Sequence, residues 1–479
     1  MKKYFLISIL IFAGLYQQLS AQNEIDALRY SQVFYGGTAR SVAMGGAFGA
    51  LGGDFASLSI NPAGIGIYKN TEITLTPSNY YVILKSNYNN NATDDRKYNF
   101  NLNNLGVVFV IKPKKEASAC KGIQMGIGFN RLNDYNYNAY MEGGNSHNSI
   151  INDYVNQAQG SKPEDLDQFS TQLAFNTYLI DTLGSLTNYI GAIPNGGALQ
   201  SKSINVTGSN NELVLTLGGN WNDKLYIGGT VGFPYVRYYE SSTYKETDKA
   251  DTIAGFKSMA YNYNLQTRGT GFNFKLGVIY RITDWVRIGA AVHTPTFYSM
   301  KDTWSSDMQS EFKDGSKFTS SSPNGSFDYQ LTTPFKADGS LAFIIGKYAL
   351  ISGDYEFIDY RNARLKASTY NYIDENRAID NDLACQSNVR AGVEVKIKNF
   401  SIRGGYTFST SPYATKLKAD NRQAFSGGLG VKFDRYFIDL AYSYVMSKQK
   451  YYLYPSVPTA VDNTITGHNA LLTFGVKFK

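Results

Sequence analysis

Apolar and polar residues alternate along most of this chain, in segments of roughly ten residues that turn residues separate. Residues 271–282 show the pattern most clearly, because every even position is apolar and every odd position except Ile279 is polar or glycine. Residues 389–398 and 401–409 repeat it. This period of two predicts β-strands with one apolar face. The apolar face would point to a core in a soluble sandwich and to lipid in a membrane barrel, and periodicity alone does not separate the two.

The connections between the strands favour the barrel. Short turns alternate with long polar stretches, as in up-and-down transmembrane barrels with short periplasmic turns and long outer loops. The short turns lie at Asn222-Asp223, Thr283-Asp284, Gly346-Lys347, Lys398-Asn399 and Asp434-Arg435, with a longer one from Lys112 to Lys121. The long stretches are residues 85–101, 141–200, 240–255, 300–326, 360–385, 410–422 and 447–467.

This reading predicts an all-β fold, a transmembrane antiparallel barrel of about fourteen strands, and an even number is usual for bacterial outer-membrane barrels. The expected strands are residues 71–84, 102–112, 121–140, 201–221, 224–246, 256–282, 285–306, 327–346, 348–366, 386–398, 400–413, 422–434, 436–453 and 468–479.

Composition and the two ends of the chain support an exported barrel. Residues 1–21 combine two lysines, an apolar run and small residues before a cut after Ala21, which predicts a cleaved signal peptide. No later apolar run approaches the roughly 18 residues of a membrane helix, whereas aromatic residues make up 14% of the chain. The last strand carries Phe478 next to the end, as expected of a barrel that the outer-membrane assembly machinery reads. We therefore expect a monomer in the bacterial outer membrane, in contact with its lipid and lipopolysaccharide.

Charge and cysteine usage add little to this picture. The formal net charge is +7, and the basic residues are dispersed, so no nucleic-acid partner is expected. Cys120 and Cys385 fall in connections at opposite ends of the predicted barrel, which predicts that they do not pair.

Residues 22–70 do not follow the strand pattern, and Gly, Ala and Ser dominate their second half. No Lys-Ser/Thr pair follows the glycines, which argues against a phosphate loop. Residues 39–65 instead resemble the hatch signature of the FadL/TodX family of outer-membrane transporters for long-chain fatty acids and other hydrophobic compounds. The matching residues are Arg40, Met44, Gly45, Gly46, Ala47, Asp54, Asn61, Pro62, Ala63 and Gly64.

The resemblance implies a hatch over residues 22–70 that plugs a barrel formed by residues 71–479. It also implies an outer capture groove, an internal apolar site, a hatch that moves, and lateral release through a wall gap at a kinked third strand. We expect that kink at Asn130, Asn133 and Asp134, where the alternation of the third strand degrades. The alternative is a strand that has simply left the bilayer at this point.

The outer loop of residues 141–200 is expected to contain an amphipathic helix. Ser161 and Glu164 have the spacing of a capping box, and Leu166, Phe169, Leu173 and Ile180 recur at helical spacing. The apolar face predicts either a helical lid packed on itself or a hydrophobic capture groove.

If the ligand is a carboxylate, a buried cation would bind it through a charge-assisted hydrogen bond. The candidates expected to face the lumen are Arg268, Lys275, Arg390 and Arg403. The alternative is that most of them pair with lumen acids such as Glu394 or Asp354.

The chemistry of the chain argues against catalysis. His147, His293 and His468 are the only histidines, and no spacing suits a metal, a cofactor or a Ser-His-acid site. Uptake of hydrophobic small molecules is therefore the predicted function. A barrel that serves as a secretion accessory or cargo shuttle, without lipid transport, is the alternative, and a general diffusion porin is disfavoured by the hatch.

Overall fold

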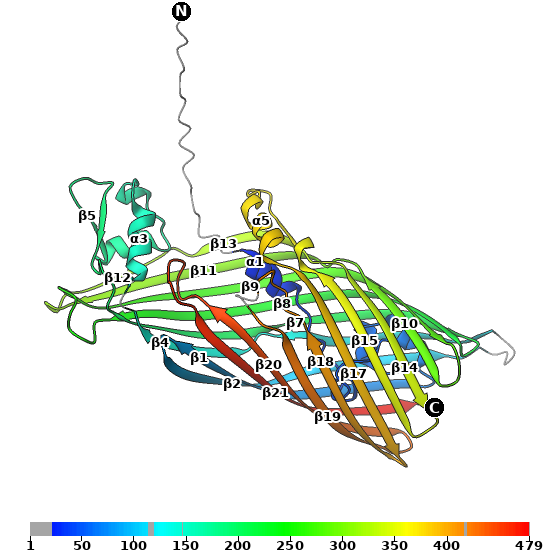
Figure 1. The fold of residues 1–479 in the computed structure, drawn as a ribbon. Helices are drawn as coiled ribbons and strands as arrows, with labels where there is room; N and C mark the ends of the chain where they lie inside the picture. Colours follow the sequence, from blue (N-terminus) through cyan, green and yellow to red (C-terminus); the bar gives the residue numbers. More distant parts are fainter. Residues whose placement is uncertain (1–21, 114–118, 146, 416–418, 479) are drawn as a thin grey trace, which may run out of the picture.

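The alternating segments form a closed antiparallel barrel in the computed structural model, which describes residues 22–113, 119–145, 147–415 and 419–478 (Figure 1). Within these residues fourteen strands pair with their neighbours, and the last strand also pairs with the first. Closure pairs the backbone N–H and C=O groups of neighbouring strands over most of the wall, which is what a chain that crosses a bilayer with strands requires. The predicted fourteen-stranded antiparallel barrel is confirmed. The expected signal peptide, residues 1–21, lies outside the described residues, as does Lys479.

The strands that close the barrel follow one another in chain order. They are β1 (Thr71–Tyr88), β2 (Asn91–Ile111), β3 (Cys120–Asp134), β7 (Leu199–Trp221), β8 (Leu225–Thr247), β9 (Phe256–Arg281), β10 (Val286–His293), β14 (Lys336–Ile345), β15 (Ala349–Asp359), β17 (Cys385–Ile397), β18 (Phe400–Ser409), β19 (Arg422–Lys432), β20 (Tyr436–Tyr451) and β21 (Val461–Phe478).

The other strands extend the wall beyond the membrane or lie in the outer loops. They are β4 (Tyr137–Gly144), β11 (Phe297–Phe312), β12 (Lys317–Ser321), β13 (Gly325–Thr332) and β16 (Arg364–Lys366), with the separate hairpin β5 (Ile180–Thr182) and β6 (Tyr189–Gly191).

The short turns lie where the sequence predicts them, and three of them contain residues in the left-handed backbone conformation typical of tight hairpin turns. Asn222 has φ 52°, Asp223 has φ 53° and Lys398 has φ 54°. The middle of the Lys112–Lys121 connection falls outside the described residues.

The predicted outer loops are partly wrong. β1 and β2 continue to a tight turn at Asn89-Asn90, so residues 85–101 are almost entirely strand. Most of 300–326 is strand as well, and β8 and β9 fill part of 240–255. Outside the bilayer both faces of a sheet can be polar, so these extensions lack the apolar alternation by which strands are recognised.

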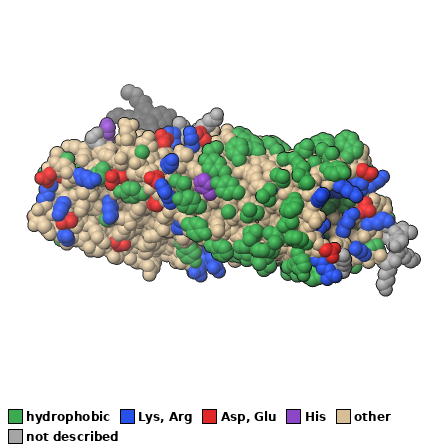
Figure 2. Space-filling view, turned by 90° about the horizontal axis from the view of Figure 1, so that it is seen from below, with side chains coloured by type: hydrophobic (Ala, Val, Ile, Leu, Met, Phe, Trp, Pro, Cys, Tyr) green, Lys and Arg blue, Asp and Glu red, His purple; other side chains and the backbone are tan. Residues whose placement is uncertain are grey.

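The outer face of the barrel carries an apolar belt (Figure 2). Apolar side chains gather in one zone of this face, next to a charged rim at the short-turn end, while the opposite part is mostly polar. Exposed belt residues include Leu217, Leu276, Ile402 and Phe474. Such a belt is the surface that a transmembrane barrel turns to lipid. No helix within the described residues is long and apolar enough to cross a membrane.

Residues 22–70 fold inside the barrel (Figure 1). This hatch, residues 22–70, contains the helices α1 (Glu24–Ser31) and α2 (Ala39–Ala43) and the 3₁₀ helices η1 (Phe55–Ser59) and η2 (Pro62–Ile67). η2 packs against β7, β8 and β9, and α2 packs against β18, β19 and β20. The hatch therefore bridges different sides of the wall.

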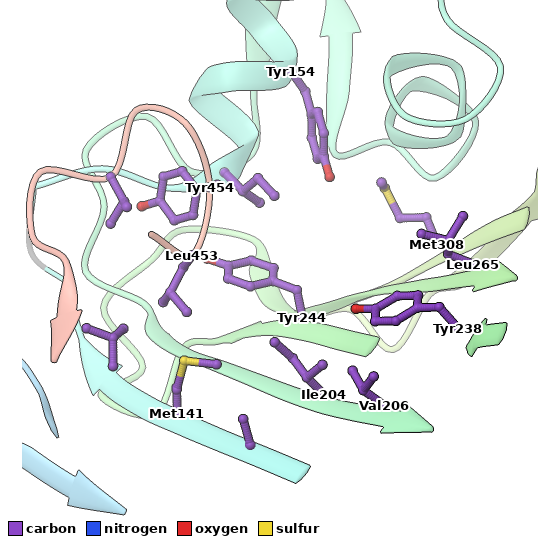
Figure 3. Close-up of a cluster of buried hydrophobic side chains, with 14 of the residues drawn as sticks. Met141, Tyr154, Ile204, Val206, Tyr238, Tyr244, Leu265, Met308, Leu453 and Tyr454 are labelled. Carbon is purple, nitrogen blue, oxygen red and sulfur yellow. The ribbon is translucent and has the colours of Figure 1, made fainter. Parts of the chain in front are cut away.

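A large hydrophobic cluster fills the barrel interior on the outer side of the hatch (Figure 3). It combines strand residues such as Met141, Tyr238, Tyr244 and Met308 with loop residues such as Tyr454. Outer-loop helices also contribute to it; they are α3 (Ile150–Ala158), α4 (Thr171–Asn176) and α5 (Ile373–Asp382), and the remaining 3₁₀ helices are η3 (Pro163–Asp165) and η4 (Tyr360–Asn362). The outer mouth is closed by packed side chains.

The predicted helix starting at Ser161 is wrong. Pro163–Asp165 form a single 3₁₀ turn, and the Asp167 carboxylate then accepts hydrogen bonds from the Phe169 N–H and the Ser170 hydroxyl. Such a side chain competes with helix formation, and Tyr178, at φ 56°, follows the end of α4. The capping box of this loop lies instead at Ser149, at the start of α3.

Cys120 and Cys385 are free thiols at the starts of β3 and β17, one at the short-turn end and the other at the outer end.

The belt predicts how lipid-facing substitutions behave. Leu276 is 62% exposed in the middle of the belt, so Leu276→Arg is expected to lower the free energy of unfolding in lipid by about 2–4 kcal/mol. Gln309→Arg, on the exposed outer extension, should change it by less than about 0.5 kcal/mol. Urea unfolding in phospholipid vesicles measures both. Equal effects of the two variants would contradict a lipid-facing position for Leu276.

Candidate functional site

The hatch motif begins with a short helix that ends in two glycines. The Thr38 hydroxyl caps α2 by accepting from the Ser41 N–H. Gly45 and Gly46 follow Met44 with φ 65° and 76°, a left-handed conformation that disfavours larger residues. Met44 and Ala47 are fully buried. The two glycines reverse the chain so that it stays inside the lumen.

Arg40 fixes the hatch to the wall through a buried ion-pair network. Its Nε lies 2.9 Å from Glu394 on β17, and it also donates to the Gly53 carbonyl at 3.4 Å. Arg403 on β18 approaches the same carboxylate at 2.6 Å and Asp439 on β20 at 2.6 Å. Because one buried carboxylate is shared by two guanidinium groups, removing either partner leaves an uncompensated charge.

Asp54 and Asn61 cap the two 3₁₀ helices. The Asp54 carboxylate accepts from the Ala56 N–H at 2.9 Å and from the Thr38 hydroxyl at 2.7 Å, which ties η1 to the start of α2. Burial raises the pKa of Asp54, and Arg40 beside it opposes that rise. Asn61 Oδ1 accepts from the Ala63 N–H, while its Nδ2 donates to the Gly49 carbonyl at 2.7 Å and to the Val278 carbonyl of β9 at 3.2 Å.

Pro62 occupies the first turn of η2, where a missing N–H costs nothing. Ala63 is fully buried, and Gly64 packs against Gly52 with no room for a side chain. Asn61-Pro62-Ala63-Gly64 is therefore a capped turn that presses against the wall.

The wall that faces the hatch is lined with glycines. A Cβ built on any of them would come within 3.0 Å of a hatch atom, so backbone and side-chain atoms of the hatch lie where wall side chains would otherwise be. These glycines are Gly106, Gly126, Gly128, Gly218, Gly228, Gly277, Gly289, Gly392, Gly405 and Gly428.

Three of the four predicted lumen cations are buried and paired with acids. Lys275 bonds to Glu212, Arg390 lies 2.8 Å from Glu356, and Arg403 shares Glu394. The prediction that Arg268 faces the lumen is wrong, because this residue is exposed on the outside of β9. Its position has the opposite parity to Lys275 on the same unbroken strand, so the two side chains point to opposite faces.

A fourth lumen cation, Lys336, was missed by the sequence analysis. It starts β14, where the alternation of Lys336, Asp338 and Ser340 with apolar or small residues predicts an inward position. It lies opposite His293, which in turn lies opposite Lys275. Lys336 is 7% exposed. Among the described residues, none makes a hydrogen bond or ion pair with its ammonium group.

A small cavity lies beside this row of three side chains. Its volume is about 30 Å³, which holds one or two waters, each needing at least roughly 10–15 Å³. Lys336 lines one side, and Tyr30 and Val33 of the hatch line another. His293 Nε2 donates to the Ile60 carbonyl at 2.8 Å, which connects the row to the hatch. The cavity cannot hold an acyl chain unless the hatch segment moves.

β3 departs from its neighbour at the residues where the sequence predicts a kink. Backbone pairing of β2 with β3 stops at Asn104 and Asn130, and β3 shifts its register against β7 between Arg131 and Asn133. Residues 91–103 of β2 have no backbone partner on the β3 side within the described residues. We call the boundary between residues 91–103 and residues 131–144 the seam.

Side chains bridge the seam in place of backbone bonds. Asn101 Nδ2 donates to Asp134 at 2.9 Å, Arg131 Nε to the Leu102 carbonyl at 3.4 Å, and Asn138 Nδ2 to the Arg96 carbonyl at 3.2 Å. Tyr98, Phe100 and Leu102 are exposed on the outer face of the seam. The wall is therefore closed here by side chains, next to an apolar outer surface.

The hatch contacts the same part of β3. The Phe34 N–H donates to the Leu132 carbonyl at 2.7 Å, and the Gly36 N–H donates to the Arg131 carbonyl at 3.0 Å. Asn130 Nδ2 donates to Ser59 at 2.9 Å and Asn133 Nδ2 to the Gln32 carbonyl at 3.4 Å. Movement of residues 32–36 would release the inner side of the seam.

The predicted groove residues lie at the outer mouth. Leu166, Leu173 and Ile180 are buried in the hydrophobic cluster, and Phe169 is half-buried with its ring centroid 5.6 Å from that of Trp304. These side chains close the mouth in the observed conformation. Among the described residues, no group of three His, Cys, Asp or Glu side chains is placed to hold a metal ion.

Comparisons with known proteins identify the fold. The sequence matches no protein-family model and no curated protein. The structure resembles the toluene transporter TodX of Pseudomonas putida, with a TM-score of 0.54 and 12% identity over 94% of this chain and 100% of that one. A FadL homologue of Pseudomonas aeruginosa gives 0.55 and 13% over 94% and 99%, and the monoaromatic hydrocarbon channel CymD gives 0.51 and 11% over 94% and 98%.

The chain thus has the hatch-plugged barrel fold of these proteins. The resemblance to the FadL/TodX family, first carried by the hatch motif, is confirmed at the level of the fold.

The glycine-lined wall predicts the effect of filling one contact. A side chain at Gly277 would collide with Asn61, so Gly277→Val is expected to displace η2 and to speed hydrogen exchange in residues 61–68 at least tenfold. Gly339→Val is the matched control, because a Cβ there meets nothing within 4 Å. Hydrogen exchange read by mass spectrometry compares the two. Unchanged exchange in Gly277→Val would contradict the tight contact.

Proposed function

We propose that this protein takes up hydrophobic small molecules across the bacterial outer membrane and releases them sideways through the seam. The observation that carries the proposal is the side-chain-bridged gap between β2 and β3, which adjoins both the hatch and the lumen cavity. The fold it shares with a toluene transporter and a monoaromatic hydrocarbon channel supports the same class of substrate.

An apolar molecule gains little from a water-filled pore, because each methylene group is about 0.8 kcal/mol more stable in an apolar environment. The outer hydrophobic cluster offers such an environment at the mouth, where Leu166, Leu173 and Ile180 are packed. We propose that a ligand displaces part of this packing on entry. The hatch fills the lumen below it, which argues against a general diffusion porin.

The next step moves the ligand to the cavity. Tyr30, Ser31, Val33 and Tyr35 of the hatch line it, so their displacement would enlarge it. Lys336, which has no hydrogen-bond or ion-pair partner in the described part of the chain, then offers its buried ammonium group to the ligand's polar end. A charged hydrogen bond of this kind contributes about 1.5–3 kcal/mol, so we propose that the substrate is a long-chain fatty acid rather than a plain hydrocarbon.

Release follows from the same displacement. When residues 32–36 leave Arg131 and Leu132, the kinked part of β3 loses its inner hydrogen bonds. The remaining bridges across the seam are side-chain bonds that water can replace at the outer mouth. The apolar chain then leaves toward Phe100 and Leu102 on the lipid-facing side. No step needs a catalytic group.

Locking the seam should stop uptake. In a Cys120→Ser/Cys385→Ser background, Asn101→Cys/Asp134→Cys joined by a short thiol-reactive cross-linker should lower oleate uptake at least tenfold. The reason is that the bridge keeps β2 and β3 together. Uptake of radiolabelled oleate by cells without another transporter measures the effect, and a reducible linker should restore it.

The matched control joins two strands that stay paired. Gln423→Cys/Met446→Cys lie opposite each other in β19 and β20, and cross-linking them should leave uptake within twofold of wild type. Normal uptake through a cross-linked seam would contradict lateral release. Loss of uptake with both linkers would point to a general need for barrel flexibility instead.

Removing the Lys336 charge should weaken the binding of fatty acids but not that of hydrocarbons. Lys336→Met is expected to weaken binding of oleate to the purified barrel about tenfold or more, while binding of a hydrocarbon of the same length changes less than twofold. Lys249→Met, at the exposed outer rim, is the control and should change neither. Titration of fluorescent-ligand displacement measures all four values.

If Lys336→Met weakened the binding of oleate and of the hydrocarbon equally, the proposed carboxylate contact would be contradicted. The proposal of lateral release would not be affected. A barrel that binds neither ligand in any form, but co-purifies with a protein cargo, would favour the cargo-shuttle alternative.

A further inference from the structure

A row of three cations crosses the outer surface of the barrel just beyond the apolar belt. Arg237 on β8 lies directly opposite Arg268 on β9, and Arg268 lies directly opposite Lys301 on β11. All three are exposed. Like charges placed directly opposite each other destabilise a sheet. Asp328 on β13 faces Lys301 at one end of the row, so the row keeps a net positive charge that an anion would neutralise.

The row has an apolar surface on its membrane side. Two residues closer to the membrane on each strand stand Tyr235, Thr270 and Ser299, and beyond them Phe233, Phe272 and Phe297 are exposed. Residues two apart on one face are separated by about 7 Å along the strand. The cations therefore lie four residues, about 14 Å along the strands, from these phenylalanines, on the outer side of the belt.

A polar groove lies on the other side of the row. Its volume is about 640 Å³, and it opens on the outer surface of β7, β8, β9, β11 and β13. The facing side chains are hydroxyls and amides, such as Ser241, Asn264 and Ser305. Tyr239 joins them with an aromatic ring. Neutral donors and acceptors of this kind, with a ring to pack against, suit the hydroxyl groups and ring faces of sugars.

The groove and the row are physically joined. Arg268 donates to the Tyr239 hydroxyl at 3.3 Å, and with the Gln266 amide oxygen turned toward it, Arg268 Nε donates to that oxygen at 2.6 Å. Tyr239 and Gln266 both line the groove. These bonds hold the guanidinium group in place although it is exposed, which lowers the entropy lost on binding an anion.

We propose that this face binds the head group of a phosphorylated glycolipid of the outer leaflet. Its phosphates contact Arg237, Arg268 and Lys301, its sugars occupy the groove, and its acyl chains lie against the phenylalanines of the belt. Guanidinium groups pair with phosphate through two parallel hydrogen bonds. The site is on the outside of the wall, so it is separate from the lumen and from the transported molecule. It rests on the membrane placement of the barrel and not on uptake.

The test measures lipid binding to the full-length barrel in neutral detergent. Hexa-acylated lipid A with two phosphates is the probe, and its phosphate-free form is the comparison, both titrated by native mass spectrometry. We expect the bisphosphorylated form to bind at least tenfold more tightly. The triple variant Arg237→Gln/Arg268→Gln/Lys301→Gln should lose that tenfold difference.

A matched control removes the same charge elsewhere. Lys245→Gln/Lys249→Gln/Lys366→Gln neutralises three exposed lysines of the outer extension, away from the belt, and should keep the tenfold preference. Slower migration after boiling, read on a denaturing gel, shows that each variant is folded. If the triple variant does not fold, the single variant Arg268→Gln should reduce the preference about threefold.

Three outcomes would overturn the proposal. They are equal binding of the two lipids by the wild-type barrel, an unchanged preference in the cation variants, and full competition by millimolar inorganic phosphate. The last result would assign the row to free phosphate and leave the sugar groove without a role.

Discussion

The hatch can occupy the lumen because glycines stand at the points where the wall comes closest to it. Gly228 and Gly277 leave the space that Pro62 and Asn61 fill, and Gly392 and Gly405 do the same for the turn after Met44. A buried backbone must also have its polar groups satisfied. The wall does this with side chains: Asp354 accepts from the Gly49 N–H. Shape and hydrogen bonding therefore act together, and the order of α2, η1 and η2 inside the barrel follows from them.

The packing of the hatch against the wall also determines where neighbouring strands keep their backbone hydrogen bonds and where they do not. Most strand pairs are joined by continuous backbone bonds, which no local change of side chains can open. At the seam β3 instead turns toward the hatch and pairs with residues 34 and 36 through Leu132 and Arg131. β3 thus exchanges its bonds with β2 for bonds to the hatch. In the proposed uptake, a moving hatch would therefore change the seam and leave the rest of the cylinder closed.

The sequence predicts the barrel well because each transmembrane strand carries its own alternation, and the tight turns use residues such as Asn222 and Asp223. It predicts the outer regions poorly. Polar strand extensions have no apolar face to reveal them, and the expected helix after Ser161 is interrupted by the local bonds of Asp167.

For the lumen residues, too, the sequence of one strand predicts which way a side chain points but not which partner it meets. The inward position of Lys275 follows from alternation, and continuing that alternation places Arg268 outside, against the first expectation. Whether an inward cation is paired depends on the neighbouring strand. Arg390 meets Glu356, whereas Lys336 meets His293. That difference is set by the register of the wall, which a single sequence does not show.

The central claim is that ligand entry opens the seam. The most direct measurement is the distance between spin labels at Tyr98 on β2 and Ser209 on β7 in lipid nanodiscs, recorded by pulsed electron resonance with and without oleate. A pair of labels at Val389 on β17 and Phe425 on β19 serves as the reference, because both strands stay paired with β18 between them. The account predicts a second, longer distance across the seam when oleate is bound, and no change in the reference pair. An unchanged distribution across the seam, in a barrel shown by mass spectrometry to hold oleate, would contradict it.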